Sequence, residues 1–152
     1  MAQFARPNSD DTVGDWAVAP LWSKVNESAT NDSPFITANG QAACVMTLTP
    51  VDNPEPGTVT LRVRARKPEG VVGELHATLL EGATERAVRV FPGLSTSWAT
   101  ASFTLTTGER DSIVSWSNLR IRLAYVGGGE GAVLFDGEAV TFDGEVVTYA
   151  GT

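Results

Sequence analysis

The clearest pattern along the chain is a strict alternation of apolar and polar residues in its middle. In Val59–Arg66 the apolar residues take every odd position, and Asn118–Val126 repeats the alternation with leucine, isoleucine and tyrosine. Successive side chains of a β-strand point to opposite faces, so this period predicts strands with one face in a core. We expect four further strands, at 42–49, 73–81, 86–91 and 97–106.

Turn-forming residues separate these segments at short intervals, for example at 50–57 and 92–96. About seven or eight short strands at this spacing are typical of a sandwich or barrel, and the spacing is too tight for parallel crossovers. Only 107–114 suits a helix, with Thr107 as its cap. The first 40 residues are rich in Asn, Asp, Ser and Pro, which predicts loops, and we expect short strands there at 15–18 and 21–25. The sequence therefore predicts an all-β protein, an antiparallel jelly-roll β-sandwich with one short helical turn.

The end of the chain contains an internal repeat. Phe-Asp-Gly-Glu-Ala-Val-Thr at 135–141 is followed by Phe-Asp-Gly-Glu-Val-Val-Thr, so an aromatic recurs at Phe135, Phe142 and Tyr149. Glycines and β-branched residues exclude a helical heptad, and each unit reads as a short strand with an Asp-Gly turn. Such a unit needs the sandwich, or other copies of the chain, to bury its aromatic side chains. The alternative is that the sequence repeats by chance at the end of the last strand. We predict a sandwich over 1–134 and a C-terminal segment, 135–152, that forms the last strand and an assembly tail.

Charge changes this picture in two ways. The net charge of −7 argues against nucleic-acid binding, which needs cations to neutralise phosphates. Arg62, Arg64 and Arg66 share the outward face of one predicted strand, with Arg120 and Arg122 expected alongside on a neighbouring strand. Adjacent like charges destabilise a sheet unless something opposes them. Glutamates of the domain are one candidate, and an acidic partner surface is the other.

Few residues offer catalytic or metal-binding chemistry. The single cysteine, Cys44, lies in an apolar stretch and is expected to be a buried, inert thiol. The single histidine, His76, falls on an outward face, so a zinc site lacks ligands. Asp10, Asp11 and Asp15 offer oxygen ligands for calcium, but loop solvation and turn formation are the simpler interpretation. We expect no catalytic residues, no metal and no cofactor.

Two of the four tryptophans lie in the loop-rich first segment. Trp16 and Trp22 are candidates for stacking on sugar rings, as aromatic planes do in sugar-binding sandwiches, although packing is the simpler role. For Trp98 and Trp116 we expect core or edge packing.

The motifs then suggest a family. Arg6–Trp16, Asp32–Ile36, the arginine-bearing strand and Leu105–Ile113 leading to 119–123 resemble a jelly-roll domain common in structural proteins of tailed phages, over residues 4–126. The tail repeat is similar to C-terminal repeats of minor tail proteins in phages of actinobacteria. The resemblance implies a non-enzymatic virion part, often symmetric and attached through a terminal segment, with no catalytic residues to transfer.

Two functions follow as expectations. The first is a bacteriophage virion structural protein, a minor tail or capsid decoration protein, that forms a homotrimer and contacts other virion proteins through its repeat aromatics and its arginine row. The alternative is a carbohydrate-binding module that contacts host cell-surface glycans through Trp16 or Trp22. A glycosidase is a third candidate, but its only support is the presence of acidic residues, and no motif singles out a catalytic pair. No stretch nears the roughly 18 apolar residues of a membrane span, and residues 1–11 lack a secretion signal. We therefore expect synthesis in the host cytoplasm and use in the virion.

Overall fold

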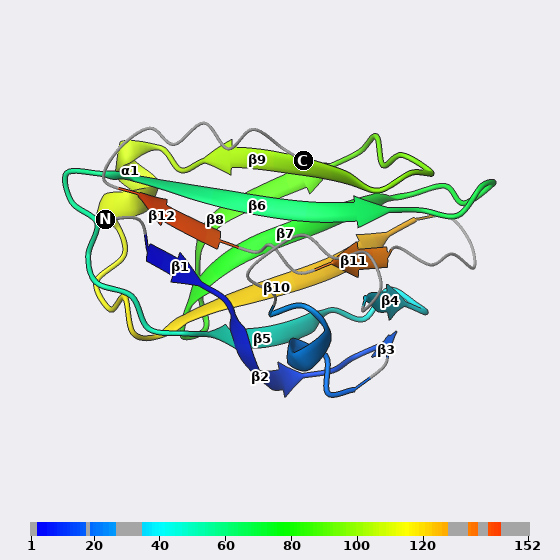
Figure 1. Cartoon of the computed structure of the whole chain (residues 1–152), viewed down its shortest axis with the longest axis horizontal. Coiled ribbons are helices and arrows are strands. Elements are labelled where there is room, and N and C mark those ends of the chain that lie inside the picture. The colour runs from blue at the N-terminus through cyan, green and yellow to red at the C-terminus, as the bar shows by residue number, and fades with distance from the viewer. Residues whose placement is uncertain (1–2, 18, 27–34, 128–133, 137–139, 144–152) are drawn as a thin grey trace.

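A computed structural model describes residues 3–17, 19–26, 35–127, 134–136 and 140–143. Two antiparallel sheets, here called sheets A and B, face each other (Figure 1). Sheet A has the order β1-β12-β6-β11-β4-β3 with β9 on the other edge of β6, and sheet B has the order β2-β5-β10-β7-β8. This confirms the predicted antiparallel all-β sandwich.

The strands of sheet A are β1 (Gln3–Ala5), β3 (Trp16–Ala17), β4 (Ile36–Ala38), β6 (Thr58–Arg66), β9 (Ala99–Thr104), β11 (Leu134–Asp136) and β12 (Val140–Asp143). Those of sheet B are β2 (Pro7–Thr12), β5 (Cys44–Leu48), β7 (Glu74–Glu81), β8 (Thr84–Phe91) and β10 (Leu119–Val126). Two short helices complete the described elements, the 3-10 turn η1 (Trp22–Lys24) and α1 (Thr107–Asp111).

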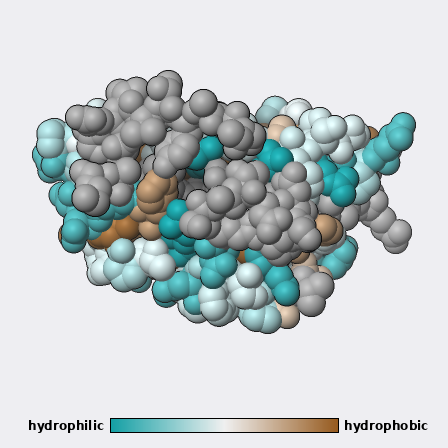
Figure 2. Space-filling model, viewed as in Figure 1, coloured by the Kyte–Doolittle hydropathy of each residue, from teal (hydrophilic) through white to brown (hydrophobic). Residues whose placement is uncertain are grey.

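The core lies between the sheets and follows the alternation in the sequence. On β6 the odd residues, from Val59 to Ala65, are at most 3% exposed, and on β10 Leu119, Ile121, Leu123 and Tyr125 are at most 1% exposed. Because apolar burial drives folding roughly in proportion to area, these two strands supply much of the interior. Figure 2 shows hydrophilic side chains over most of the described surface on one face, with apolar ones in small patches.

The helical turn at α1 begins one residue earlier than expected. Thr106, not Thr107, is the cap: its hydroxyl accepts the N–H of Glu109 at 3.1 Å, and the Glu109 carboxylate accepts the N–H of Thr106 at 2.8 Å. This reciprocal pair requires a threonine three residues before a glutamate, which only Thr106 satisfies. The sequence therefore contained the signal for the true cap.

The first segment differs most from its prediction. Residues 16–17 form strand β3 as expected. The strand expected at 21–25 is absent, and Trp22–Lys24 form the turn η1 there instead. Pro7–Thr12 forms an unexpected strand, β2. The Asp10 carboxylate of β2 accepts the N–H groups of Leu21 and Trp22 at 2.7 and 2.8 Å. These bonds satisfy the N–H groups at the start of η1. The pattern of apolar and polar residues does not reveal such a role for an aspartate side chain.

Part of the C-terminal repeat is built into sheet A. The backbone of Phe135 lies between Ala65 and Ile36, and that of Phe142 lies between Val59 and Gln3. Strands β11 and β12 thus follow one another along the same edge of β6. The division predicted between 134 and 135 falls inside β11, and residues 144–152, including Tyr149, lie outside the described part. In that described part no helix has the length and apolar character needed to cross a bilayer.

Candidate functional site

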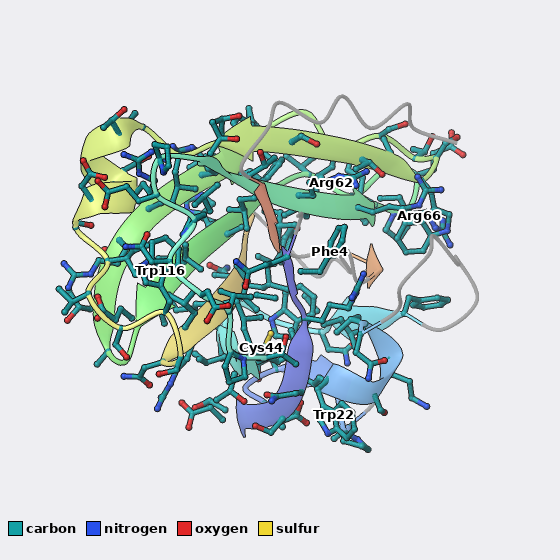
Figure 3. The ribbon with its side chains drawn as sticks, turned by 60° about the vertical axis from the view of Figure 1, so that its left-hand side comes forward. Phe4, Trp22, Cys44, Arg62, Arg66 and Trp116 are labelled. Carbon is teal, nitrogen blue, oxygen red and sulfur yellow. The ribbon has the colours of Figure 1, made fainter. Side chains whose placement is uncertain are left out.

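The arginine row lies on the outer face of β6, as predicted. Arg62 is 8% exposed, while Arg64 and Arg66 are half-buried, and Figure 3 shows Arg62 and Arg66 along the same strand. The register of β6 with β9 sets Thr100 opposite Arg64, whose Nη1 donates to the threonine hydroxyl at 3.4 Å.

Arg120 and Arg122 do not lie beside this row, so that prediction is wrong. They are on β10, in sheet B, where Arg120 pairs with Asp11 and Arg122 pairs with Glu85. Alternation shows which side chains share a face of one strand, but it does not show which strands are neighbours.

Arg66 differs from five other arginines because none of the carboxylates in the described residues pairs with it. Arg86, Arg89, Arg110, Arg120 and Arg122 each form an ion pair. Within the described ranges no carboxylate pairs with Arg66, and its buried Nε has no hydrogen-bond partner. Its guanidinium carbon instead lies 5.3 Å from the ring centroid of Trp98.

Two aromatic rings complete this surface. Trp98 directly precedes β9 and is half-buried; Phe35 directly precedes β4 and is 36% exposed. Their ring centroids are 5.9 Å apart with the planes tilted by 56°, and the Arg64 guanidinium lies 6.0 Å from the Trp98 ring. We call Phe35, Trp98, Arg64 and Arg66 the Trp98 platform.

Strand pairing explains why these residues meet. Ala99 of β9 pairs with Ala65 of β6, which places Trp98 beside Arg66 at the end of the ladder. On the other side of β6, β11 links it to β4, which Phe35 precedes. Three segments far apart in the sequence therefore converge over one end of β6. From the sequence Trp98 was expected to pack and Phe35 was given no binding role, because neither residue lies in a motif that indicates ligand binding.

The two tryptophans expected to stack on sugars lie elsewhere. Trp16 is 3% exposed in the core, so its ring has no open face for a sugar. Trp22 is half-buried on η1 and packs against the core; in Figure 3 it lies at the bottom of the view, well away from Arg66 at the upper right. Trp116 is 7% exposed and belongs to the core, as expected.

The acidic residues near the N-terminus have separate structural roles. Asp10 caps η1, Asp11 pairs with Arg120, and Asp15 accepts the N–H of Ala42 at 2.9 Å. Among the residues that the structure describes, no three histidine, cysteine or acidic side chains gather into a metal-binding group.

An apolar pocket of about 230 Å³ opens between the edge strands β8 and β9. Phe91 and Phe103 meet edge-to-face in its wall, with centroids 5.0 Å apart. The pocket exists because the facing positions on β6 and β9 hold small residues, Ala65, Ala99 and Ala101. Thr100, the partner of Arg64, also lines it, so the pocket adjoins the Trp98 platform.

The cysteine and the histidine both lie where the sequence placed them. Cys44 is completely buried, and burial raises the pKa of its thiol to about 12. It is therefore protonated at neutral pH and a poor nucleophile. His76 is half-buried on the outer face of sheet B, with Nε2 at 2.6 Å from the carboxylate of Glu74.

Comparisons with known proteins identify the fold and nothing narrower. No protein-family model and no curated protein matches the chain. A cyclase from Fischerella sp. TAU matches with TM-score 0.51 and 16% identity, over 97% of this chain and all of that one (100%). The agarase AgWH50C matches with TM-score 0.50 and 11% identity, over 91% of this chain and 26% of that one. A CBM4 carbohydrate-binding module matches with TM-score 0.49 and 12% identity, over 86% and 79% of the two chains. At these identities the likeness to the cyclase and the agarase shows a shared fold.

Proposed function

We propose that the chain is a non-catalytic carbohydrate-binding module whose ligand site is the Trp98 platform. The observation that carries this proposal is the pairing of Trp98 with Phe35 at 5.9 Å, beside the guanidinium groups of Arg64 and Arg66. A sugar ring has an apolar face of C–H groups and an edge of hydroxyls. Aromatic planes pack against the former and guanidinium N–H groups donate to the latter.

Strands position the residues of the platform. Arg64 and Arg66 lie on β6, and Phe35 and Trp98 directly precede β4 and β9. Binding costs less when side chains are positioned in advance, because less ordering has to occur. Because the likeness to the cyclase and to part of the agarase shows only the fold, the proposal rests on these side chains and not on the neighbours.

The virion role stays a prediction. Self-association was expected because the C-terminal repeat cannot bury its own aromatics. In the structure the strands of that repeat pair with β6 of the same chain, so their backbone partner is internal. The two roles are compatible, since a particle-surface protein can also bind glycans.

Affinity electrophoresis through gels that contain polysaccharides tests the proposal. The folded wild-type chain should be retarded by at least one polysaccharide, and Trp98→Ala should remove most of that retardation. Trp22→Ala is the matched control, because Trp22 is also half-buried but lies away from the platform, and it should bind like the wild type. Circular dichroism establishes that both variants fold. Equal retardation of Trp98→Ala and wild type, or no retardation in any gel, would overturn the proposal.

A further inference from the structure

We infer that the glycan bound at the Trp98 platform is anionic, with carboxylate or sulfate groups along its chain. This inference rests on the proposed function and adds the chemical class of the ligand. Its central observation is that Arg66, on the platform, pairs with no carboxylate in the described part of the chain, whereas five arginines elsewhere each do.

Arg66 carries a charge that an anion would stabilise. Its guanidinium is always charged and the residue is half-buried, and among the described residues its buried Nε has no hydrogen-bond partner. A carboxylate or sulfate accepts two parallel N–H bonds from such a group, whereas a neutral hydroxyl offers a weaker, single contact. An anionic sugar therefore gains more at Arg66 than a neutral sugar of the same shape.

The arginine row repeats its positive charges at a regular spacing. Arg62, Arg64 and Arg66 are two residues apart on one strand, so their Cα atoms are spaced by about 6.6–6.8 Å on the same face. Arg64 and Arg66 both lie against the Trp98 ring, so an anionic group bound beside that ring would be close to two guanidinium groups.

The arginine row also gives an anion a preferred place to bind. The chain has a net charge of −7, and three of its eleven basic residues stand together on the outer face of β6. A polyanion is repelled by the protein at large, so its attraction is confined to a cluster of cations such as this row. A local field of this kind orients the ligand, and its effect weakens as salt is added.

The aromatic pair favours a glycan over an acidic protein partner. Acidic side chains of a protein would use the arginines but would gain little from the ring faces of Phe35 and Trp98. A sugar uses both features at once, the rings for its C–H face and the guanidinium groups for its charged substituent.

The test compares charged and neutral forms of the same polymers. The full chain is titrated by calorimetry with polygalacturonate against its methyl ester, and with dextran sulfate against dextran, in low and high sodium chloride. One or both anionic polymers should bind about tenfold more tightly than their neutral forms, and salt should weaken that binding. The carboxylate and sulfate arms distinguish the two sources of charge.

Two arginine variants localise the effect. Arg66→Gln keeps a long polar side chain but removes the charge, and it should weaken binding of the anionic polymer about tenfold. Arg122→Gln removes the same charge from the outer face of sheet B and should leave affinity nearly unchanged. An equal loss in both variants would mean general charge attraction and would overturn the inference.

The remaining outcomes separate this inference from the proposed function. If the neutral polymers bind as tightly and Trp98→Ala abolishes their binding, the anionic class is wrong and the proposed function stands. If no polymer binds the folded chain and none retards it in gels, both are wrong. If anionic polymers need Arg66 but bind equally well to Trp98→Ala, the surface recognises acidic groups in general, and the inference of a glycan is overturned.

Discussion

The carboxylate of Glu109 in α1 and the guanidinium of Arg89 in β8 form a two-pronged ion pair, with N–O distances of 2.8 and 2.6 Å. The same carboxylate accepts the N–H of Thr106 and so closes the capping box of α1. One side chain therefore both starts the helix and attaches it to sheet B. The Arg89 guanidinium, helped by the Thr106 N–H, lowers the pKa of Glu109 to about 2, although partial burial acts in the opposite direction.

Glu109→Gln is expected to lower the free energy of unfolding by about 1–2 kcal/mol at pH 7, because it removes a charge-assisted pair that solvent partly screens. The folded pKa lies below the ordinary 4.5, so this contribution is complete above pH 4.5 and is lost as the pH falls toward 2. Urea denaturation at neutral and at acidic pH should show the difference from wild type shrinking in acid. The exposed Glu69→Gln is the control. A difference that is unchanged in acid would contradict the assignment.

Cys44 is expected to resist alkylation in the folded protein. Burial raises the pKa of its thiol to about 12, so at pH 8 the reactive thiolate is scarce and the sulfur is enclosed. Iodoacetamide should label Cys44 quickly in urea and slowly without it. The thiol ionises near pH 9.0 in the unfolded chain but stays protonated there in the folded protein. The free energy of unfolding should therefore decrease above pH 9. Cys44→Ala removes the thiol and should lack this contribution to the decrease. Fast labelling of the folded chain would contradict this expectation, because it would show that the Cys44 thiol becomes accessible to the reagent without unfolding.

The sequence predicted the strands better than it predicted their neighbours. Residues 59–66 and 118–126 became β6 and β10 because their alternation reflects burial of one face, a local property. The assignment of Arg120 to the neighbourhood of Arg62 failed because long-range pairing decides which strands are adjacent, and pairing leaves no mark in the pattern of one strand.

The same limit applies to the candidate site. Trp98 and Phe35 are 63 positions apart and meet only because β9 and the β11–β4 pair lie on opposite sides of β6. Trp16 shows the reverse case, since an aromatic in a polar, loop-rich segment turned out to be a core residue. Residue type suggested which side chains can bind sugars, but topology decided which of them lie at the surface together.

Gly127→Ala is expected to destabilise the fold by about 2 kcal/mol, through overpacking. A Cβ at Gly127 would lie 2.3 Å from the Tyr125 hydroxyl oxygen and 2.5 Å from the carbonyl oxygen of Val72. Tyr125 cannot move away freely, because it is buried and its hydroxyl donates to that same carbonyl at 2.5 Å. Gly93→Ala is the matched control, since a Cβ there meets nothing within 4 Å. Urea denaturation should separate the two variants, and equal stabilities would show that the Tyr125 ring shifts at little cost.

Filling the pocket between β8 and β9 should stabilise the protein. Ala101 pairs with Val63 and lines the pocket of about 230 Å³, so Ala101→Val adds two methylene-sized groups where space is available. Each fully buried group contributes about 0.8 kcal/mol, but the pocket is open on one side, so we expect a gain of about 0.5–1 kcal/mol in total. For a chain of this size that raises the melting temperature by about 1–4 °C. Ser102→Val, on the opposite face of the same strand, supplies the β-propensity of valine without filling the pocket. If both variants raise the melting temperature equally, strand propensity is the cause; if Ala101→Val lowers it, the walls are too rigid for a larger side chain.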